Sequence, residues 1–390
     1  MKNVLRLLVF AALVTVFALP SYAQGAAAAQ TPAAAGPCTE AEAKAALYNE
    51  FRANFKGTPE QQKVAYDKGK EYLGKYGACT EAADLPIIKY IQNWVGKYEA
   101  EKLKFDCTKA VNENPAQAFE ACQPWLAADR DNLKPHLALV AAGINTYMKK
   151  DNSLNARAAA EARTTLQMIE AGKTTDVWVP FSNQQDAAAG LRYYIAAWTY
   201  DANPAEAATQ LLSVAQSNSS LAKEPATFQL LGAAIYNGDV KKMADQYKAQ
   251  CEGKDASTEC DILLNKINYA LDRVIDAYAR TVALSNTNAK YAATATAIRP
   301  ILETLYKQRH EGQVAELNNL INNVLSKPLP LPGQEPPLPT PASTASDGNG
   351  TGGTATPTTP AGGTAPAKPA ATPTPTPAKP APAAQKPPRS

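Results

Sequence analysis

Apolar residues recur at every third or fourth position through almost all of residues 38–327, and no alternating apolar and polar run of useful length interrupts them. This spacing places the apolar side chains on one face of an α-helix. The strongest stripe consists of Leu263, Ile267, Leu271, Val274, Tyr278 and Val282. The pattern therefore predicts an all-α fold.

Capping residues divide the pattern into helices of moderate length. Thr39-Glu40-Ala41-Glu42 has the form of a capping box, and Thr58-Pro59 puts proline at a first helical position, where its missing N–H costs nothing. The expected helices begin at Thr39, Thr58, Thr80 and Pro115, run through 137–144, 158–169, 184–200, 204–216, 226–236, 240–250 and 263–282, and end with one helix around Arg299-Pro300 and one over 314–325.

Residues 173–183 break the helical pattern. Their centre, Val177-Trp178-Val179-Pro180-Phe181, is apolar but too short for a helix, and polar runs lie on both sides of it. We expect this break to separate a first helical half, 38–172, from a second, 184–327.

The first 23 residues have the features of a secretory signal peptide. Lys2 and Arg6 precede an apolar run from Leu7 to Leu19, and Ser21-Tyr22-Ala23 supplies small residues before the expected cleavage site. The alternative, a membrane anchor, is disfavoured because the run is short and Pro20 ends it. We expect an exported protein of the periplasm or extracellular envelope, with a flexible lead over 24–37 and no transmembrane segment after signal removal.

The C-terminal residues 328–390 have a composition of their own. They hold 18 of the 30 prolines and no Phe, Trp or Tyr. Such a segment buries too little apolar area to offset the entropy lost on ordering, so we expect a disordered tail with polyproline II character. It would serve as a spacer or as a docking strand for proline-binding partners, unless it only improves solubility.

The net charge of +3 overstates the basic character of the body. Without the signal peptide and the tail, residues 24–327 hold 33 basic and 34 acidic side chains. A nearly neutral body lacks the basic surface that nucleic acids require, which excludes them as expected partners.

The six cysteines form three pairs, each centred on a predicted turn. Residues equidistant from the turn of a helical hairpin lie side by side, so the spacing predicts three disulfides. The predicted pairs are Cys38–Cys79, Cys107–Cys122 and Cys251–Cys260. Six free thiols and other connectivities remain the alternatives. Without a Cys-x-x-Cys motif and with only two histidines, we expect no metal site and no cofactor.

One segment resembles the tetratricopeptide repeat. Its matching positions are Phe228, Leu231, Gly232, Ile235 and Ala244, with Asn237-Gly238-Asp239 as the expected turn between the two helices of the unit. The resemblance implies antiparallel helical hairpins in a right-handed array, with a groove that binds peptides or proteins and performs no chemistry. An irregular α-bundle with one chance match is the alternative.

Catalytic motifs are scarce. There is no nucleophile elbow, phosphate loop or zinc-protease motif. His136 is expected on the surface at a helix start, and His310 at a polar helix end. We therefore expect a protein without enzymatic activity.

The break and the following helix supply the candidate binding residues, Trp178, Phe181, Tyr194 and Trp198. Aromatic side chains dominate interface energetics, although such stripes more often belong to a core. The leading hypothesis is an exported, non-enzymatic helical scaffold that binds proteins or peptides in the cell envelope. A hydrolase of wall polymers tethered by its tail and a ligand-free structural spacer are the alternatives.

Overall fold

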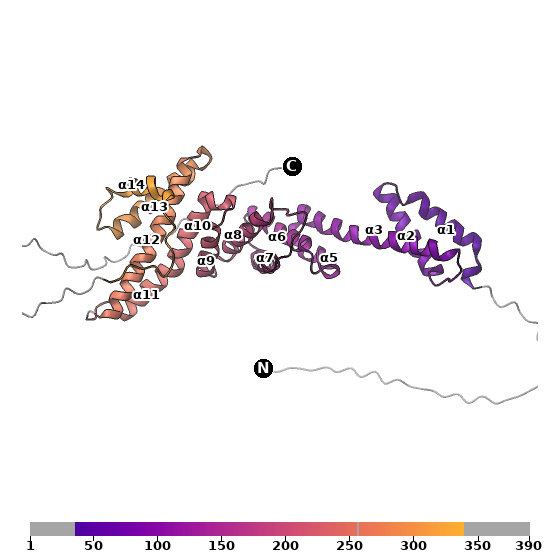
Figure 1. Ribbon diagram of the computed structural model, residues 1–390, viewed down its shortest axis with the longest axis horizontal. Coiled ribbons are helices and arrows are strands. Elements are labelled where there is room, and N and C mark those ends of the chain that lie inside the picture. The colour runs from indigo at the N-terminus through magenta and orange to yellow at the C-terminus, as the bar shows by residue number, and fades with distance from the viewer. Residues whose placement is uncertain (1–35, 256, 339–390) are drawn as a thin grey trace, which may run out of the picture. The chain divides into compact units, whose positions relative to one another are not determined.

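The computed structural model describes residues 36–255 and 257–338, and within these ranges every regular element is helical (Figure 1). The all-α prediction is confirmed. The signal peptide (1–23), most of the lead (24–35) and residues 339–390 of the tail lie outside the described residues. Among those described, no helix has the length and apolar character needed to cross a bilayer.

The chain divides into two compact units between Tyr98 and Glu99, inside the 30-residue helix α3 (Asp84–Glu113). The first unit contains η1 (Pro37–Thr39), α1 (Ala41–Asn54), α2 (Pro59–Tyr76) and the start of α3. Its core consists of aromatic and branched side chains, of which Phe51, Tyr72 and Ile91 are almost completely buried.

The caps of the first unit match the sequence only in part. Thr58 forms the expected capping box with Gln61, each side chain bonding the other residue's backbone. The box expected at Thr39 is absent, because Glu40 is the N-cap of α1 and the Thr39 hydroxyl donates to the carbonyl oxygen of Gly36 instead.

The second unit contains the remaining helices. They are α4 (Pro115–Ala121), α5 (Gln123–Ala128), α6 (Leu133–Met148), α7 (Asn155–Glu170), α8 (Gln184–Thr199), α9 (Pro204–Ala215), η2 (Ser220–Lys223), α10 (Pro225–Ile235), η3 (Tyr236–Val240), α11 (Lys241–Gln250), α12 (Thr258–Asn286), η4 (Ala289–Tyr291), α13 (Ala292–Arg309), α14 (Leu317–Asn323) and η5 (Val324–Ser326). From α6 to α10 each helix packs on the next, α10 packs on α12, and α12 packs on α13. Short connections between packed neighbours make this a series of helical hairpins.

The three predicted disulfides are present. The Cα atoms are 5.5 Å apart in Cys38–Cys79, 4.4 Å in Cys107–Cys122 and 5.7 Å in Cys251–Cys260. The first joins η1 to the loop after α2, the second joins α3 to the end of α4, and the third joins the end of α11 to the first turn of α12. The first bridge therefore ties together the two ends of the α1–α2 pair, and the other two span the connections between α3 and α4 and between α11 and α12, as the spacing indicated.

The break at 173–183 does not separate two halves. Trp178 and Phe181 pack against one core cluster that takes residues from α6, α7 and α8, including Leu137, Ile169 and Ile195. The division falls at Tyr98 instead. The helices on both sides of the break share one core, because the apolar side chains of the break pack against it.

The turn expected at Asn237-Gly238-Asp239 is also absent. Residues 236–240 form a π-helical segment that continues α10 into α11. A Cβ on Gly238 would lie 3.1 Å from the backbone nitrogen of Ala205, so this glycine admits the start of α9. The Asn237 amide donates to the Tyr200 hydroxyl and to a helix carbonyl, instead of capping a second helix.

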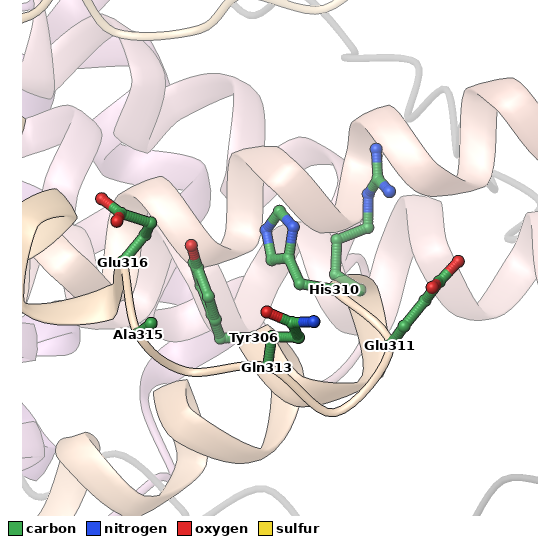
Figure 2. A pocket seen from close by; sticks show the side chains of 7 residues that line it. Tyr306, His310, Glu311, Gln313, Ala315 and Glu316 are labelled. Carbon is green, nitrogen blue, oxygen red and sulfur yellow. The ribbon is translucent and has the colours of Figure 1, made fainter. Parts of the chain in front are cut away.

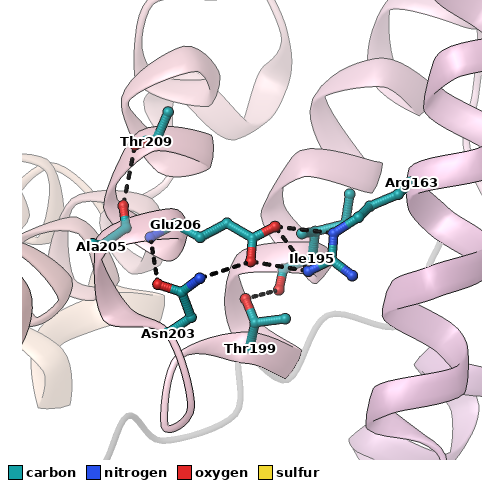
Figure 3. Close-up of polar contacts among 7 residues, drawn as sticks. All are labelled: Arg163, Ile195, Thr199, Asn203, Ala205, Glu206 and Thr209. Carbon is teal, nitrogen blue, oxygen red and sulfur yellow. Dashed lines mark hydrogen bonds and ion pairs between the residues drawn. The ribbon is translucent and has the colours of Figure 1, made fainter.

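A forked ion pair connects α7 to α9 across the intervening helix (Figure 3). Arg163 donates from Nε to Glu206 Oε1 at 2.9 Å, and from Nη2 to Oε1 at 2.8 Å and to Oε2 at 2.9 Å. Asn203, the N-cap of α9, accepts from the Glu206 backbone N–H and donates to its carboxylate. The cap thus positions the carboxylate that the guanidinium binds.

Candidate peptide-binding site

Residues 327–338, here called the strap, lie along α12. Arg280 donates from Nη2 to the carbonyl oxygens of Lys327 at 2.9 Å and Pro328 at 3.1 Å. The Tyr269 hydroxyl donates to the Leu331 carbonyl at 2.8 Å. The Asn265 amide donates to the Pro336 carbonyl at 2.8 Å. We expected an unfolded tail from residue 328 onward, and these contacts correct that boundary.

The three donors share one side of α12 because of their spacing. Residues four, eleven and fifteen positions apart on a helix point in directions within about 60° of one another. Strap numbering rises as α12 numbering falls, so the strap runs antiparallel to the helix. Proline has no N–H, and a proline-rich backbone therefore offers mainly carbonyl oxygens. A row of side-chain donors matches that backbone.

Arg280 is a preorganised donor at one end of this side of α12. Its side chain is 8% exposed, and Nε lies 2.6 Å from Oδ1 of Asp276, which is 13% exposed. The guanidinium also lies over the Phe228 ring, 5.9 Å from its centroid. Burial raises the pKa of Asp276, while the Arg280 hydrogen bond and the charges of Arg280 and Lys327 oppose that rise. Held in this way, Nη2 faces the first two carbonyls of the strap.

The apolar side chains of the strap are only partly covered. Leu329 packs against the core cluster of α10, α12 and α13, and Pro330 and Leu331 are half-buried. Lys327 and Pro328 are exposed. The strap is therefore bound mainly through its backbone and one leucine.

Arg273 adds an unused donor one helical turn from Tyr269. Its side chain is 6% exposed and Nη1 lies 3.3 Å from the Asp239 carboxylate. Its Nε has no hydrogen-bond partner among the described residues. A buried N–H without a partner is costly, so Arg273 carries an unsatisfied polar atom beneath this part of α12.

The four aromatic residues expected at a binding surface are used in packing. Trp198 is 7% exposed, and Trp178, Phe181 and Tyr194 are half-buried against the same core cluster. The Tyr194 and Trp198 rings are 5.4 Å apart. Their burial accounts for the stripe as core, and a binding role for them stays a prediction.

Four of the five residues of the repeat-like motif are also used in packing. Phe228, Leu231, Gly232 and Ile235 are buried, but Ala244 is exposed and makes no helix crossing. A Cβ on Gly232 would lie 2.7 Å from the Tyr278 ring, so the glycine admits α12. The repeat would place Ala244 where two helices cross, and its exposure does not fit that position, while the resemblance as a whole stays a prediction.

His136 is buried, contrary to the expectation of a surface residue. Nδ1 bonds the Glu161 carboxylate and Nε2 bonds the Arg130 carbonyl oxygen. Burial alone would lower the pKa of His136, but these two acceptors raise it above its ordinary value. Each ring nitrogen has an acceptor as its partner, which favours the doubly protonated ring. His136 therefore bridges α6 and α7, and neither of its nitrogens is free for catalysis.

His310 lies in a surface hollow of about 360 Å³ at the end of α13 (Figure 2). Figure 2 shows Tyr306 and His310 side by side, with Glu316 and Glu311 at opposite ends. The two carboxylates do not converge, and acid–base catalysis by a carboxylate pair requires that they do. A second hollow, of about 470 Å³, is lined by Asp129, Asp131, Lys134 and Asp176, and Lys134 and Asp176 form an ion pair with each other.

The described residues contain no group of three or more His, Cys, Asp and Glu side chains placed to bind a metal ion. We define the strap site as Asn265, Tyr269, Asp276 and Arg280. Of the sites described, only the strap site holds a ligand-like segment.

Sequence reasoning missed the strap site, although a signal was present. Asp276 and Arg280 form a pair of opposite charges four residues apart, within the helix that carries the strongest apolar stripe of the chain. Charged groups at core positions require partners, and here the partners are each other and two backbone carbonyls.

Comparison with known proteins assigns no family to this fold or site. No protein-family model matches the chain, and no curated protein and no solved structure is significantly similar to it.

Proposed function

We propose that this chain is an exported, non-enzymatic helical scaffold that binds proteins or peptides of the cell envelope, with the strap site as its binding surface. The observation that supports this proposal is the row of α12 donors, Arg280, Tyr269 and Asn265, on the carbonyls of an extended proline-rich segment. This is the chemistry of a peptide-binding surface, occupied by the chain's own residues.

Proline-rich segments suit such a site for an energetic reason. They already favour an extended conformation, so they lose little conformational entropy on binding. Arg280 is fixed by Asp276 before any ligand arrives, which reduces the ordering cost on the protein side.

The setting of the site supports the envelope as its location. Three disulfides bridge neighbouring elements, and disulfides persist in oxidising compartments outside the cytosol. The secretory features of residues 1–23 point the same way. A series of packed hairpins also agrees with the repeat-like binding scaffold that the sequence resembles.

The test requires a chain whose strap has been released. The double substitution Lys327→Glu/Leu329→Asp, here called the open variant, places a negative charge beside Asp276 and removes the leucine that packs on the core. Unchanged circular dichroism and disulfide maps would establish that the open variant is folded.

The probe is a fluorescent peptide with the sequence of residues 327–338, measured by anisotropy against the full-length open variant. We expect saturable binding that weakens about tenfold with Arg280→Lys, which keeps the charge beside Asp276 but loses the guanidinium fork. Tyr269→Phe, which removes only a hydroxyl, should weaken binding by a smaller factor. Arg309→Lys is the matched control, because Arg309 of α13 pairs with Asp272 of α12, and it should leave peptide binding unchanged.

Failure of the folded open variant to bind the peptide would reject the proposal in favour of the structural spacer. Equal binding by the Arg280→Lys and control variants would show that the peptide binds elsewhere.

A further inference from the structure

The strap begins with a Lys-Pro dipeptide, and Arg280 contacts both of its carbonyls. Lys327 has extended backbone angles, with φ −95° and ψ 148°, as the residue before a proline prefers. One Nη2 group therefore reaches the carbonyl oxygens of Lys327 and Pro328 together. The Lys327 charge also lies near enough to Asp276 to oppose the rise in its pKa.

This arrangement combines two features that recognise Lys-Pro. The charges of Lys327 and Asp276 attract each other, and the fixed guanidinium of Arg280 donates to the two consecutive carbonyls. A proline after the lysine favours the extended backbone that presents both carbonyls. A dipeptide with a neutral first residue would lose the charge interaction, and one without proline would lose the preorganised backbone.

The same dipeptide recurs in the tail. Every lysine after residue 328 precedes a proline, at Lys368-Pro369, Lys379-Pro380 and Lys386-Pro387. The remaining copy in the chain, Lys134-Pro135, lies in the first turn of α6, where the backbone is helical. The tail thus supplies three further ligands with the chemistry that the strap site holds.

We propose that the strap site is a Lys-Pro receptor and that the three Lys-Pro dipeptides of the chain's own tail exchange with Lys327-Pro328 on Arg280. The proposal rests on the peptide-binding function proposed above and names the ligand of that site.

The length of the tail allows the exchange within one chain. Lys368 lies thirty positions after Leu338, and a chain of that length can span up to about 100 Å. Helix α12, with 29 residues, is only about 43 Å long. Three copies on one tether raise the effective ligand concentration at the site, which favours the chain's own tail over the tail of a second copy.

Photo-cross-linking in the full-length chain tests the exchange directly. A photoreactive amino acid replaces Ala370 or Ala381, each directly after a Lys-Pro dipeptide. Mass spectrometry then measures cross-links to residues 276–284 of α12 in the wild-type chain and in the open variant. We expect the yield to rise about tenfold in the open variant, because the competing strap is released.

Two substitutions check that the cross-link reports the proposed contact. In the open variant, Arg280→Lys should return the cross-link yield to the wild-type level or below, and Arg309→Lys should leave that yield unchanged. Replacing Lys368, Lys379 and Lys386 with alanine in the tail of the open variant should also remove the cross-link. A yield that is indifferent to Arg280 or to the tail lysines would overturn the proposal.

Mixing isotopically labelled and unlabelled chains identifies the source of the tail. Cross-links confined to one label class support exchange within a chain, whereas mixed-label cross-links at the frequency of random pairing would overturn the assignment to the chain's own tail. If the open variant binds the 327–338 peptide but its tail gives no cross-link, this inference fails while the peptide-binding function stands. If neither occurs, both fail.

Discussion

Phe181 lies directly on the backbone of Gly190. A Cβ atom on this glycine of α8 would be 2.2 Å from Cε1 of the ring, closer than two carbon atoms can approach. Phe181 comes from the irregular segment before α8, and its ring is half-buried against the core. Because Gly190 has no side chain, the Phe181 ring can pack on α8, and this contact holds the segment 173–183 against the helical array.

Gly190→Ala should destabilise the chain by about 2 kcal/mol, because overpacking the Phe181 ring outweighs the better helix propensity of alanine. Gly96→Ala is the matched control, since its Cβ would meet nothing within 4 Å inside α3. That change should stabilise the chain by up to about 1 kcal/mol. Denaturant unfolding measures both. Similar effects of the two alanines would contradict the contact.

The disulfides should differ in their contributions to stability. The Cys38–Cys79 bridge closes a separation of 41 residues and Cys251–Cys260 one of 9. Loop-closure entropy predicts losses of about 4 and about 2.5 kcal/mol when each pair is replaced by alanine. Denaturant unfolding of the two double variants tests this order, and a larger loss for the short loop would refute it.

His136 should make stability depend on pH near neutrality. Its pKa is raised in the folded chain by its two acceptors, although burial opposes this, so the folded state binds the proton more tightly. The resulting stabilisation is fully present below the unfolded pKa of about 6.5 and is lost as pH rises through the higher folded pKa. Unfolding free energies measured from about pH 5 to about pH 9 should fall in this window.

His136→Gln should remove that decline, and Glu161→Gln should reduce it by taking away the charged acceptor. If wild-type and His136→Gln chains lose stability in parallel over the same range, another group is responsible.

The Arg163–Glu206 fork should contribute modestly to stability. Its side chains are 40% and 26% exposed, so solvent screens the pair, but the fork and the Asn203 cap fix its geometry. A double-mutant cycle should give a coupling of about 0.5–1 kcal/mol. Lys63–Asp67, at 68% and 55% exposure, is the control pair and should give a smaller coupling, because solvent screens it more strongly. Equal couplings would show that the fork adds nothing.

The features predicted correctly from the sequence depend on local spacing. The disulfides follow from the symmetry of each cysteine pair about its turn, and the Thr58 cap follows from residues three positions apart. The failures come from long-range contacts. Asn237-Gly238 has turn chemistry, yet the approach of α9 and the bond to Tyr200 keep it helical. His136 follows a polar helix start, and its partner Glu161 lies 25 residues further along.

The strap site shows why composition alone misjudged residues 328–338. Proline-rich segments bury little apolar area, which correctly excludes a core of their own. Binding through backbone carbonyls needs no such core, only donors such as Arg280 and Tyr269 on a folded neighbour. Those donors lie 47 to 62 residues before their acceptors, beyond the reach of any local pattern.

The antiparallel course of the strap also determines where Leu338 lies. From Arg280 to Asn265 the strap retraces about 22 Å of α12, toward the end closed by the Cys251–Cys260 bridge. Release of the strap would therefore move the attachment point of the residues after Leu338 from this covalently reinforced end to the opposite end of the helix.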